Sequence, residues 1–179
     1  LTSLSEQQMV DCHSLLQVPP LLPGCSGGLP EGGFKFAKTH GLCSEESYNY
    51  TGKWGKCKQS GCQEVVPKGK VQGYKGLAPV PRIIPASEEQ LMSAVAQQPV
   101  SVAVQADSDA FMHYKTGVLS GDCGSWAPIG MVDHAVLLVG YGTDAKLGDY
   151  WLVKNSWGTT WGMEGYFMLA RGKNAGSKW

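Results

Sequence analysis

Two stretches in the second half of the chain carry residues whose types and spacing could support nucleophilic chemistry. His134 stands at the start of an apolar run that continues to Val139, and Asn155 ends a second run that begins at Tyr150. A thiol or hydroxyl nucleophile is activated by a neighbouring base, and the base is oriented by a third group. The residues therefore predict an imidazole with one ring nitrogen bonded to the Asn155 carbonyl and the other facing a nucleophile. Trp157 is predicted to shield that hydrogen bond from water.

The elements that must hold these residues are two strands joined by a polar turn. Residues 132–139 are apolar at nearly every place, a pattern typical of a strand buried on both faces. Residues 143–148 are predicted to form a hairpin loop, which makes the two strands antiparallel. The ends that carry His134 and Asn155 meet only if the strand pairing and the bends allow it.

Start signals for helices occur at three other places. A capping box or an N-terminal proline marks each of them. They are Ser5 with Gln8 before Cys12, Pro30 before Gly41, and Ser87 with Gln90 before Pro99. Strands are predicted over residues 100–105 and 164–171, whereas residues 42–73 show little periodicity and are predicted to be loop-rich.

Composition narrows the range of partners. The 179 residues contain 15 basic and 15 acidic side chains. This balance offers no electrostatic reason to expect binding to nucleic acid or to an anionic membrane surface. No apolar stretch approaches the roughly 20 residues that a membrane-spanning helix needs. We therefore expect neither nucleic acid nor membrane among the partners.

The cysteines indicate an oxidising compartment. Six cysteines and 24 glycines favour disulfides over zinc, because no histidine lies at ligand spacing from a cysteine pair. Metal binding by Cys57 and Cys62 stays a minor alternative. Asn49 begins a glycosylation sequon, which agrees with secretion. The chain shows no signal peptide, and because it starts at Leu1 rather than at Met we expect it to be truncated.

Residues 24–28 contain two further candidates for a nucleophile, Cys25 and Ser26. Gly-Cys-Ser-Gly-Gly resembles the Gly-Asp-Ser-Gly-Gly segment of chymotrypsin-like serine proteases. However, Cys25 replaces the aspartate, and the histidine motif Ala-Ala-His-Cys that accompanies the serine is absent. Neither Cys25 nor Ser26 is therefore expected to be a nucleophile.

The segments around His134 and Asn155 do resemble one family closely. Val-Asp-His-Ala at 132–135 and Lys-Asn-Ser-Trp-Gly at 154–158, followed by Trp161-Gly162, are similar to the histidine and asparagine motifs of papain-like cysteine proteases. The likeness extends in order through residues 4–7, 24–28, 44–48 and 98–102. It implies an α+β, papain-like two-domain fold, with a helical half over residues 1–73 and a β-rich half over 74–179 that carries His134 and Asn155.

The same resemblance implies a nucleophile outside this chain. The family's cysteine stands in a Cys-Gly-Ser-Cys-Trp context, about 130–150 residues before its histidine and asparagine. None of the six cysteines fits, so we expect the nucleophile upstream of Leu1 and this stretch alone to be inactive. No cofactor is implied.

Further residues take roles from the resemblance. Those assigned to substrate binding are Gly28, Leu29, Pro30, Ala103, Val132 and Ala135 around the second residue before the cut, and Asp133, Trp157 and Trp161 on the leaving-group side. A Cys12–Cys57 disulfide is implied by the family. Cys43 and Cys62 are extra to the family's framework and close in sequence, so we predict a local disulfide between them.

The resemblance implies a monomeric cysteine endopeptidase that cuts peptides or unfolded proteins, secreted or held in a lysosome- or vacuole-like compartment. A propeptide or a cystatin-like inhibitor would be its protein partners. The alternative is a papain-like homologue without a nucleophile that serves as a binding or structural module. Retention of an oriented histidine favours the enzyme.

Overall fold

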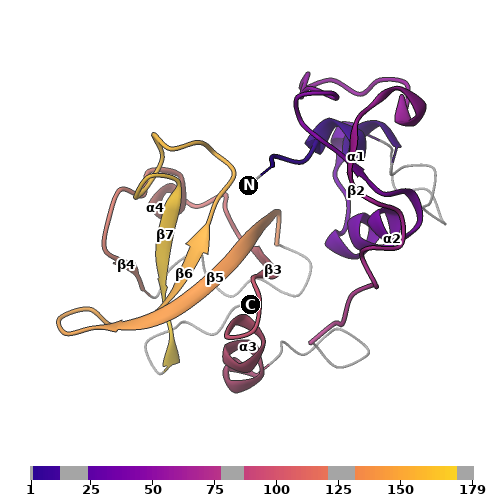
Figure 1. Ribbon diagram of the computed structural model, residues 1–179. Helices are drawn as coiled ribbons and strands as arrows, with labels where there is room; N and C mark the ends of the chain where they lie inside the picture. The colour runs from indigo at the N-terminus through magenta and orange to yellow at the C-terminus, as the bar shows by residue number, and fades with distance from the viewer. Residues whose placement is uncertain (1, 13–23, 78–86, 121–131, 173–179) are drawn as a thin grey trace. The chain divides into compact units, whose positions relative to one another are not determined.

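The computed structural model describes residues 2–12, 24–77, 87–120 and 132–172, which form two compact units, Leu1–Lys75 and Gly76–Trp179 (Figure 1). The N-terminal unit contains α1 (Glu6–Cys12), η2 (Gly24–Ser26), α2 (Pro30–His40), β1 (Leu42–Cys43), η3 (Gln59–Gly61) and β2 (Glu64–Val66). The C-terminal unit contains α3 (Glu88–Val95), β3 (Val100–Val104), α4 (Asp109–Met112), β4 (Val118–Leu119), β5 (His134–Asp144), β6 (Gly148–Lys154) and β7 (Tyr166–Ala170). This mixture of helices and sheets confirms the α+β class.

The first capping box forms only in part. Gln8 N donates to Ser5 Oγ at 3.0 Å, so Ser5 caps α1 as expected. The Gln8 side chain does not return to the Ser5 backbone. Its Oε1 accepts from Cys43 N at 2.9 Å and its Nε2 donates to Gly41 O at 3.3 Å. Because Gln8 is fully buried, it satisfies distant backbone groups instead of closing a local box.

The capping box at α3 is complete. Ser87 Oγ accepts from Gln90 N, and Gln90 Oε1 accepts from Ser87 N, both at 3.2 Å. Gln90 is exposed and has no competing partner among the described residues, so the local signal determines its geometry.

Residues 42–73 contain two strands that the sequence does not predict. Leu42 pairs with Val66 and Cys43 with Glu64 in a small antiparallel sheet. Strands of two and three residues are too short to show an alternating pattern, which is why they escape a search for periodicity.

Both predicted disulfides are present in the N-terminal unit. Cys12 bonds to Cys57 across 45 residues and Cys43 to Cys62 across 19 residues. Cys25 is an exposed free thiol.

Removing the Cys12–Cys57 disulfide, which closes the longer of the two loops, should destabilise the protein. The double substitution Cys12→Ala with Cys57→Ala is expected to lower the free energy of unfolding by about 4 kcal/mol, since the unfolded chain regains the entropy of a 45-residue loop. Chemical denaturation of the full-length protein, with and without the two substitutions, measures this difference. A loss below about 1 kcal/mol would show that this loop entropy is not what stabilises the unit.

A five-stranded sheet organises the C-terminal unit (Figure 1). Its strand order is β3-β5-β6-β7-β4, with β4 parallel to β7 and the other neighbours antiparallel. The core gathers on one face of the sheet, where the side chains of Leu138, Trp151, Val153 and Phe167 are fully buried. These residues come from the three central strands, so the core holds the hairpin in place.

β5 is not buried on both faces, and that prediction is wrong. Val136 and Leu138 point into the core, but the alternating residues Ala135 and Leu137 are exposed, Leu137 by 37%. β5 pairs antiparallel with both of its neighbours, in a sheet whose core lies on one side, and such strands bury every second residue. The continuous apolar run therefore gives apolar side chains to an exposed face as well.

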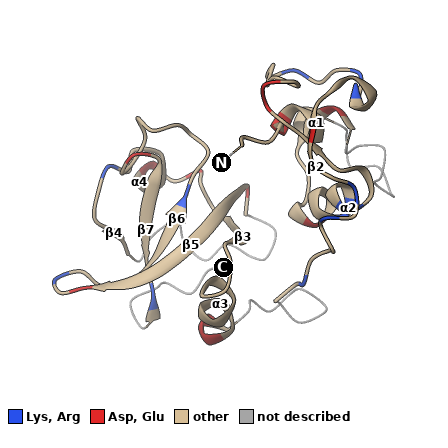
Figure 2. Cartoon of the chain, viewed as in Figure 1, with Lys and Arg blue, Asp and Glu red and all other residues tan. Residues whose placement is uncertain are grey.

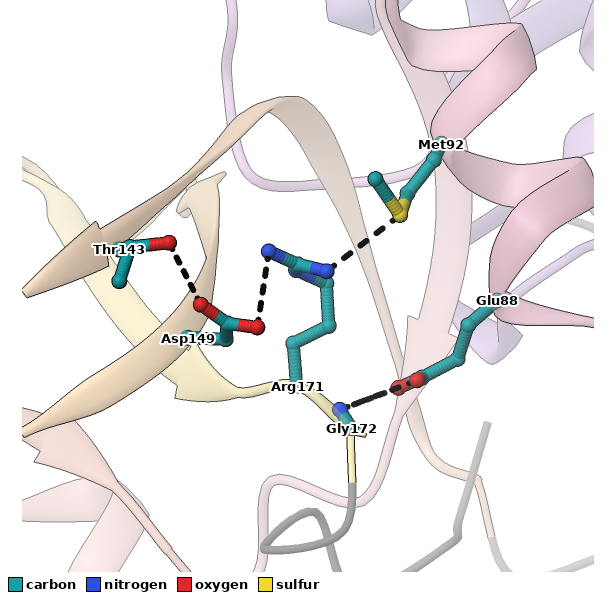
Figure 3. A network of polar contacts seen from close by, with 6 residues as sticks. All are labelled: Glu88, Met92, Thr143, Asp149, Arg171 and Gly172. Atoms are coloured by element: carbon teal, nitrogen blue, oxygen red, sulfur yellow. Dashed lines mark hydrogen bonds and ion pairs between the residues drawn. The ribbon is translucent and has the colours of Figure 1, made fainter.

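Polar contacts at the end of β7 join three elements (Figure 3). Arg171 pairs with Asp149 of β6 at 3.4 Å, and its Nη1 lies 3.4 Å from the Met92 sulfur of α3. Gly172 N donates to both carboxylate oxygens of Glu88, at 3.0 and 3.1 Å. The last strand is thus tied to the hairpin and to α3.

Charged residues of both signs are interspersed over both units (Figure 2). Within the described part of the chain, no helix is both long enough and apolar enough to cross a membrane. The same part holds no cluster of three or more His, Cys, Asp or Glu side chains suited to a metal ion.

Candidate active site

His134 is the first residue of β5, where the sheet begins. Its Cα pairs with that of Val104 at the end of β3. Two hydrogen bonds of Asp133 extend this pairing, from Asp133 N to Val104 O at 3.2 Å and from Ala106 N to Asp133 Oδ1 at 2.8 Å. The Asp133 carboxylate thus fixes the backbone just before His134. The imidazole stands half-buried at the rim of the sheet.

Asn155 directly follows β6 and is almost completely buried. Its backbone N donates to Gly165 O at 2.9 Å, which closes the loop between β6 and β7. The pairing of β5 with β6 shifts by one residue between Leu138 and Gly140. Beyond this shift the strands continue to Leu137 opposite Lys154, next to Asn155.

The predicted hydrogen bond between the two side chains is present. His134 Nε2 lies 2.8 Å from Asn155 Oδ1. Ser156 N also donates to Oδ1, at 2.8 Å, which identifies that atom as the amide oxygen. An oxygen can only accept, so Nε2 carries the proton of this hydrogen bond. In a neutral ring Nδ1 is then unprotonated and free to accept a proton.

Trp157 lies against the imidazole. The two ring centroids are 5.2 Å apart with an angle of 35° between the planes. The indole is 39% exposed, so it is positioned between solvent and the core of the unit. This placement fits a cover over the histidine and its hydrogen bond, and it leaves indole surface for a ligand.

Phe111 is the residue that the sequence analysis missed. It is 2% exposed, and its ring meets Trp157 edge-on at 5.4 Å and His134 edge-on at 6.5 Å. Ser108 caps α4 by accepting from Phe111 N at 3.3 Å, which fixes where the ring enters the core. The signal in the sequence was a Ser-x-x-Phe helix start, which predicts a helical turn and not its contacts.

Trp161, which the resemblance assigns to the leaving-group side, packs against Trp157. Its ring is only 9% exposed and packs against Phe111 at 5.2 Å and Trp157 at 5.3 Å. The indole Nε1 donates to Met112 O at 3.0 Å. Because its polar atom is satisfied inside the unit, Trp161 supports Trp157 instead of presenting a surface of its own.

Glycine follows each of these tryptophans for a geometric reason. Gly158 and Gly162 have φ angles of +85° and +59°, which residues with side chains rarely adopt. At Gly162 a Cβ would also lie 2.5 Å from the carbonyl oxygen of Tyr166. The two Trp-Gly pairs therefore mark turns of the loop that carries the indole rings.

Tyr114 completes the aromatic cluster, with its ring 5.6 Å from that of Trp161. Its hydroxyl donates to Gly117 O at 2.6 Å and accepts from Met168 N at 3.2 Å. Burial raises the pKa of Tyr114, and the hydrogen bond from Met168 N opposes part of that rise. The hydroxyl therefore stays neutral and remains a donor under physiological conditions.

The residues assigned to the substrate pocket divide between the units. In the C-terminal unit, Ala103 of β3 lies opposite Ala135 of β5, both are exposed on the same face, and Val132 is exposed just before them. In the N-terminal unit, Gly28 and Leu29 are exposed and Pro30 opens α2. Each unit thus has small or apolar residues among those that the resemblance assigns to substrate.

Comparison with known proteins identifies the family. The profile described as papain family cysteine protease matches residues 1–178. Cysteine proteinase COT44 of Brassica napus is 41% identical over 179 residues, covering 99% of this chain and 48% of that protein. The chain spans about half the length of the curated relatives it matches.

Solved structures with similar folds belong to cysteine proteases as well. The Carica candamarcensis cysteine protease CMS1MS2, in complex with E-64, has a TM-score of 0.77 and 37% identity, covering 99% of this chain and 71% of that one. The ragweed pollen allergen Amb a 11, a cysteine protease in its proform, has a TM-score of 0.76 and 39% identity, covering 97% and 48%. The chain therefore belongs to the papain family of cysteine proteases.

Proposed function

We propose that the intact protein is a cysteine endopeptidase whose thiol nucleophile lies upstream of Leu1. The observation that supports this most is the hydrogen bond from His134 Nε2 to Asn155 Oδ1, with Oδ1 fixed by Ser156 N. That arrangement leaves Nδ1 as the proton acceptor, which is the state a base needs beside a thiol.

His134 acts as both base and acid in the proposed reaction. His134 Nδ1 takes the thiol proton, and the resulting thiolate attacks the scissile carbonyl carbon. The imidazolium then gives its proton to the leaving amine, so the C–N bond breaks and a thioester remains. Water, deprotonated by Nδ1, then attacks the thioester carbon, so a C–O bond forms and the C–S bond breaks. The acid is released, and the imidazolium returns its proton to the thiolate. Throughout, Asn155 holds the ring plane, and Trp157 limits the access of water to that contact.

The substrate proposed is an extended peptide or an unfolded protein. Ala103, Ala135 and Val132 offer apolar surface to the side chain of the second residue before the cut. In the N-terminal unit, Gly28, Leu29 and Pro30 are the residues that the resemblance assigns to the same substrate residue. Asp133 is engaged with Ala106 N, so on the leaving-group side it would act through the backbone that it fixes. The exposed indole of Trp157 is the direct contact there.

Processing and location form part of the same proposal. The two disulfides favour folding in an oxidising compartment, and hence a secreted or vacuole-like destination. The proform structure of Amb a 11 supports the proposal that a propeptide is a partner of this protein. A cystatin-like inhibitor is proposed to bind the same site. We propose that the mature enzyme acts as a monomer.

Peptide hydrolysis by the full-length protein tests this function. We expect it to cleave an unfolded protein such as denatured casein, and to lose that activity after incubation with E-64. Binding of the peptide without any cleavage would instead support the alternative, a papain-like binding module without a nucleophile.

Asn155 is expected to act by positioning. Asn155→Ala should lower kcat about 10- to 100-fold with little change in KM, because a hydrogen bond to an ionised imidazole contributes roughly 1.5–3 kcal/mol. Ser156→Ala is the matched control, since Ser156 contacts Asn155 through its backbone N only. Equal effects of the two substitutions would contradict the role.

A further inference from the structure

One motif of the N-terminal unit has no part in the proteolytic site. Asn49-Tyr50-Thr51 is the only Asn-x-Ser/Thr sequence among the 179 residues, and its middle residue is not proline. This pattern is the acceptor for N-linked glycans in proteins that pass through the secretory pathway. A short pattern arises by chance, so the case depends on what surrounds Asn49.

The loop that carries Asn49 is held firmly on both sides. Before it, Tyr48 is buried, with its hydroxyl donating to Asp11 Oδ2 at 2.8 Å and its carbonyl accepting from Ser5 Oγ at 2.6 Å. After it, Thr51 N donates to Gln7 Oε1 at 2.8 Å. Asn49 itself lies between these anchors, outside any helix or strand, and is exposed.

The Asn49 carboxamide has no hydrogen bond, ion pair or ring contact with any described residue. Its neighbour Tyr50 is also exposed, whereas Thr51 Oγ1 donates to Gln7 Oε1 at 3.0 Å. A glycan on the Asn49 nitrogen would therefore displace no packed side chain and break no contact. Within the motif, Tyr50 N donates to Glu45 Oε1 at 2.7 Å and Thr51 bonds to Gln7, whereas the Asn49 side chain makes no such contact.

The disulfides favour folding of this loop in a compartment where N-glycans are added. Cys43 and Cys57 lie on either side of the motif in sequence, and each is part of a disulfide. Disulfides form in the compartments where N-glycans are added. An exposed acceptor and an oxidised framework in one short segment are what a glycosylated secretory protein needs.

We propose that Asn49 is an N-glycosylation site. In the modification, the Asn49 amide nitrogen attacks the anomeric carbon of a lipid-linked diphosphate oligosaccharide. A C–N bond forms, the C–O bond to phosphate breaks, and the lipid diphosphate leaves with the electron pair while the amide loses one proton. The site rests on the proposed secretory routing, but not on the proteolytic activity.

The test uses the full-length protein secreted from eukaryotic cells, once with its own leader and once with an added secretion leader. Treatment with a peptide N-glycosidase should remove one glycan's mass and convert Asn49 to aspartate, which peptide mass spectrometry in heavy-oxygen water records. Asn49→Gln should be secreted in similar yield but without that mass, because its side chain has no contact to lose. Thr51→Ser should retain the glycan.

The outcomes separate the two proposals. Protein secreted with either leader but unmodified at Asn49 overturns the glycosylation site. Modification only with the added leader supports the site and contradicts the proposed routing. Loss of secretion for Asn49→Gln, restored by neither leader, would show that Asn49 is needed for folding and would also contradict the argument from its free carboxamide.

Discussion

Replacing His134 with alanine in the full-length protein is expected to lower kcat/KM by at least about 10,000-fold. The substitution removes the base that ionises the thiol and the acid that protonates the leaving amine, so both halves of the reaction lose their proton carrier. His134 is only half-buried and contributes little to the core, so the fold should survive. Cleavage of a fluorogenic peptide, together with circular dichroism, measures both effects.

His113→Ala provides the matched control. His113 follows α4 in the same unit and is exposed, and its Nδ1 lies 3.1 Å from Asp109 O in the first turn of that helix. Its loss should leave kcat/KM within about twofold, since it contacts neither His134 nor Asn155. A His134→Ala enzyme that keeps a tenth of the activity would contradict the assignment of the base.

The second large effect is expected at Phe111. Phe111→Ala should lower the free energy of unfolding by about 3–5 kcal/mol, because a fully buried aromatic ring leaves a cavity among Trp157, Trp161 and Phe167. We also expect kcat to fall, because Trp157 loses the ring against which it rests. Guanidinium denaturation followed by tryptophan fluorescence measures the loss of stability.

Met112→Ala is the control for Phe111. Met112 is the next residue of α4, its side chain is exposed, and its contact with Trp161 uses the backbone carbonyl. The substitution should cost less than about 1 kcal/mol. If the two substitutions destabilise the protein equally, the aromatic cluster is not what holds this face of the unit together.

The chemistry of the site could be predicted from the sequence because rare residues stand at fixed places in it. His134, Asn155 and Trp157 were assigned from their types and order, and the structure brings all three together. Whether the hairpin ends would meet could not be predicted. That depends on the one-residue shift near Gly140, and a single glycine within a strand is a weak marker of a bulge.

Other features depended on tertiary context. The pattern at Ser5 and Gln8 is the same as at Ser87 and Gln90, yet only the second pair forms a complete capping box. Burial of Gln8 against backbone groups more than thirty residues away decides the difference, and no local pattern encodes it. The prediction that β5 is buried on both faces is wrong for a similar reason, since apolar composition does not show which faces of a strand other elements cover.

The roles of the substrate residues remain predictions. Ala103 and Ala135 lie together on an exposed face, as a pocket wall requires, but Trp161 is buried. The resemblance identifies positions in a motif, and the packing around each position decides which side chains reach the surface.

The most direct test of the proposed enzyme is to map the residue of the full-length protein that E-64 modifies. We expect one equivalent of inhibitor, bound to a cysteine upstream of Leu1, because the family's spacing of about 130–150 residues before the histidine leads to or before the start of this stretch. His134→Ala should slow that labelling sharply, because the thiol would no longer be ionised. Absence of labelling, or labelling at the exposed Cys25, would contradict the account and favour a papain-like binding module.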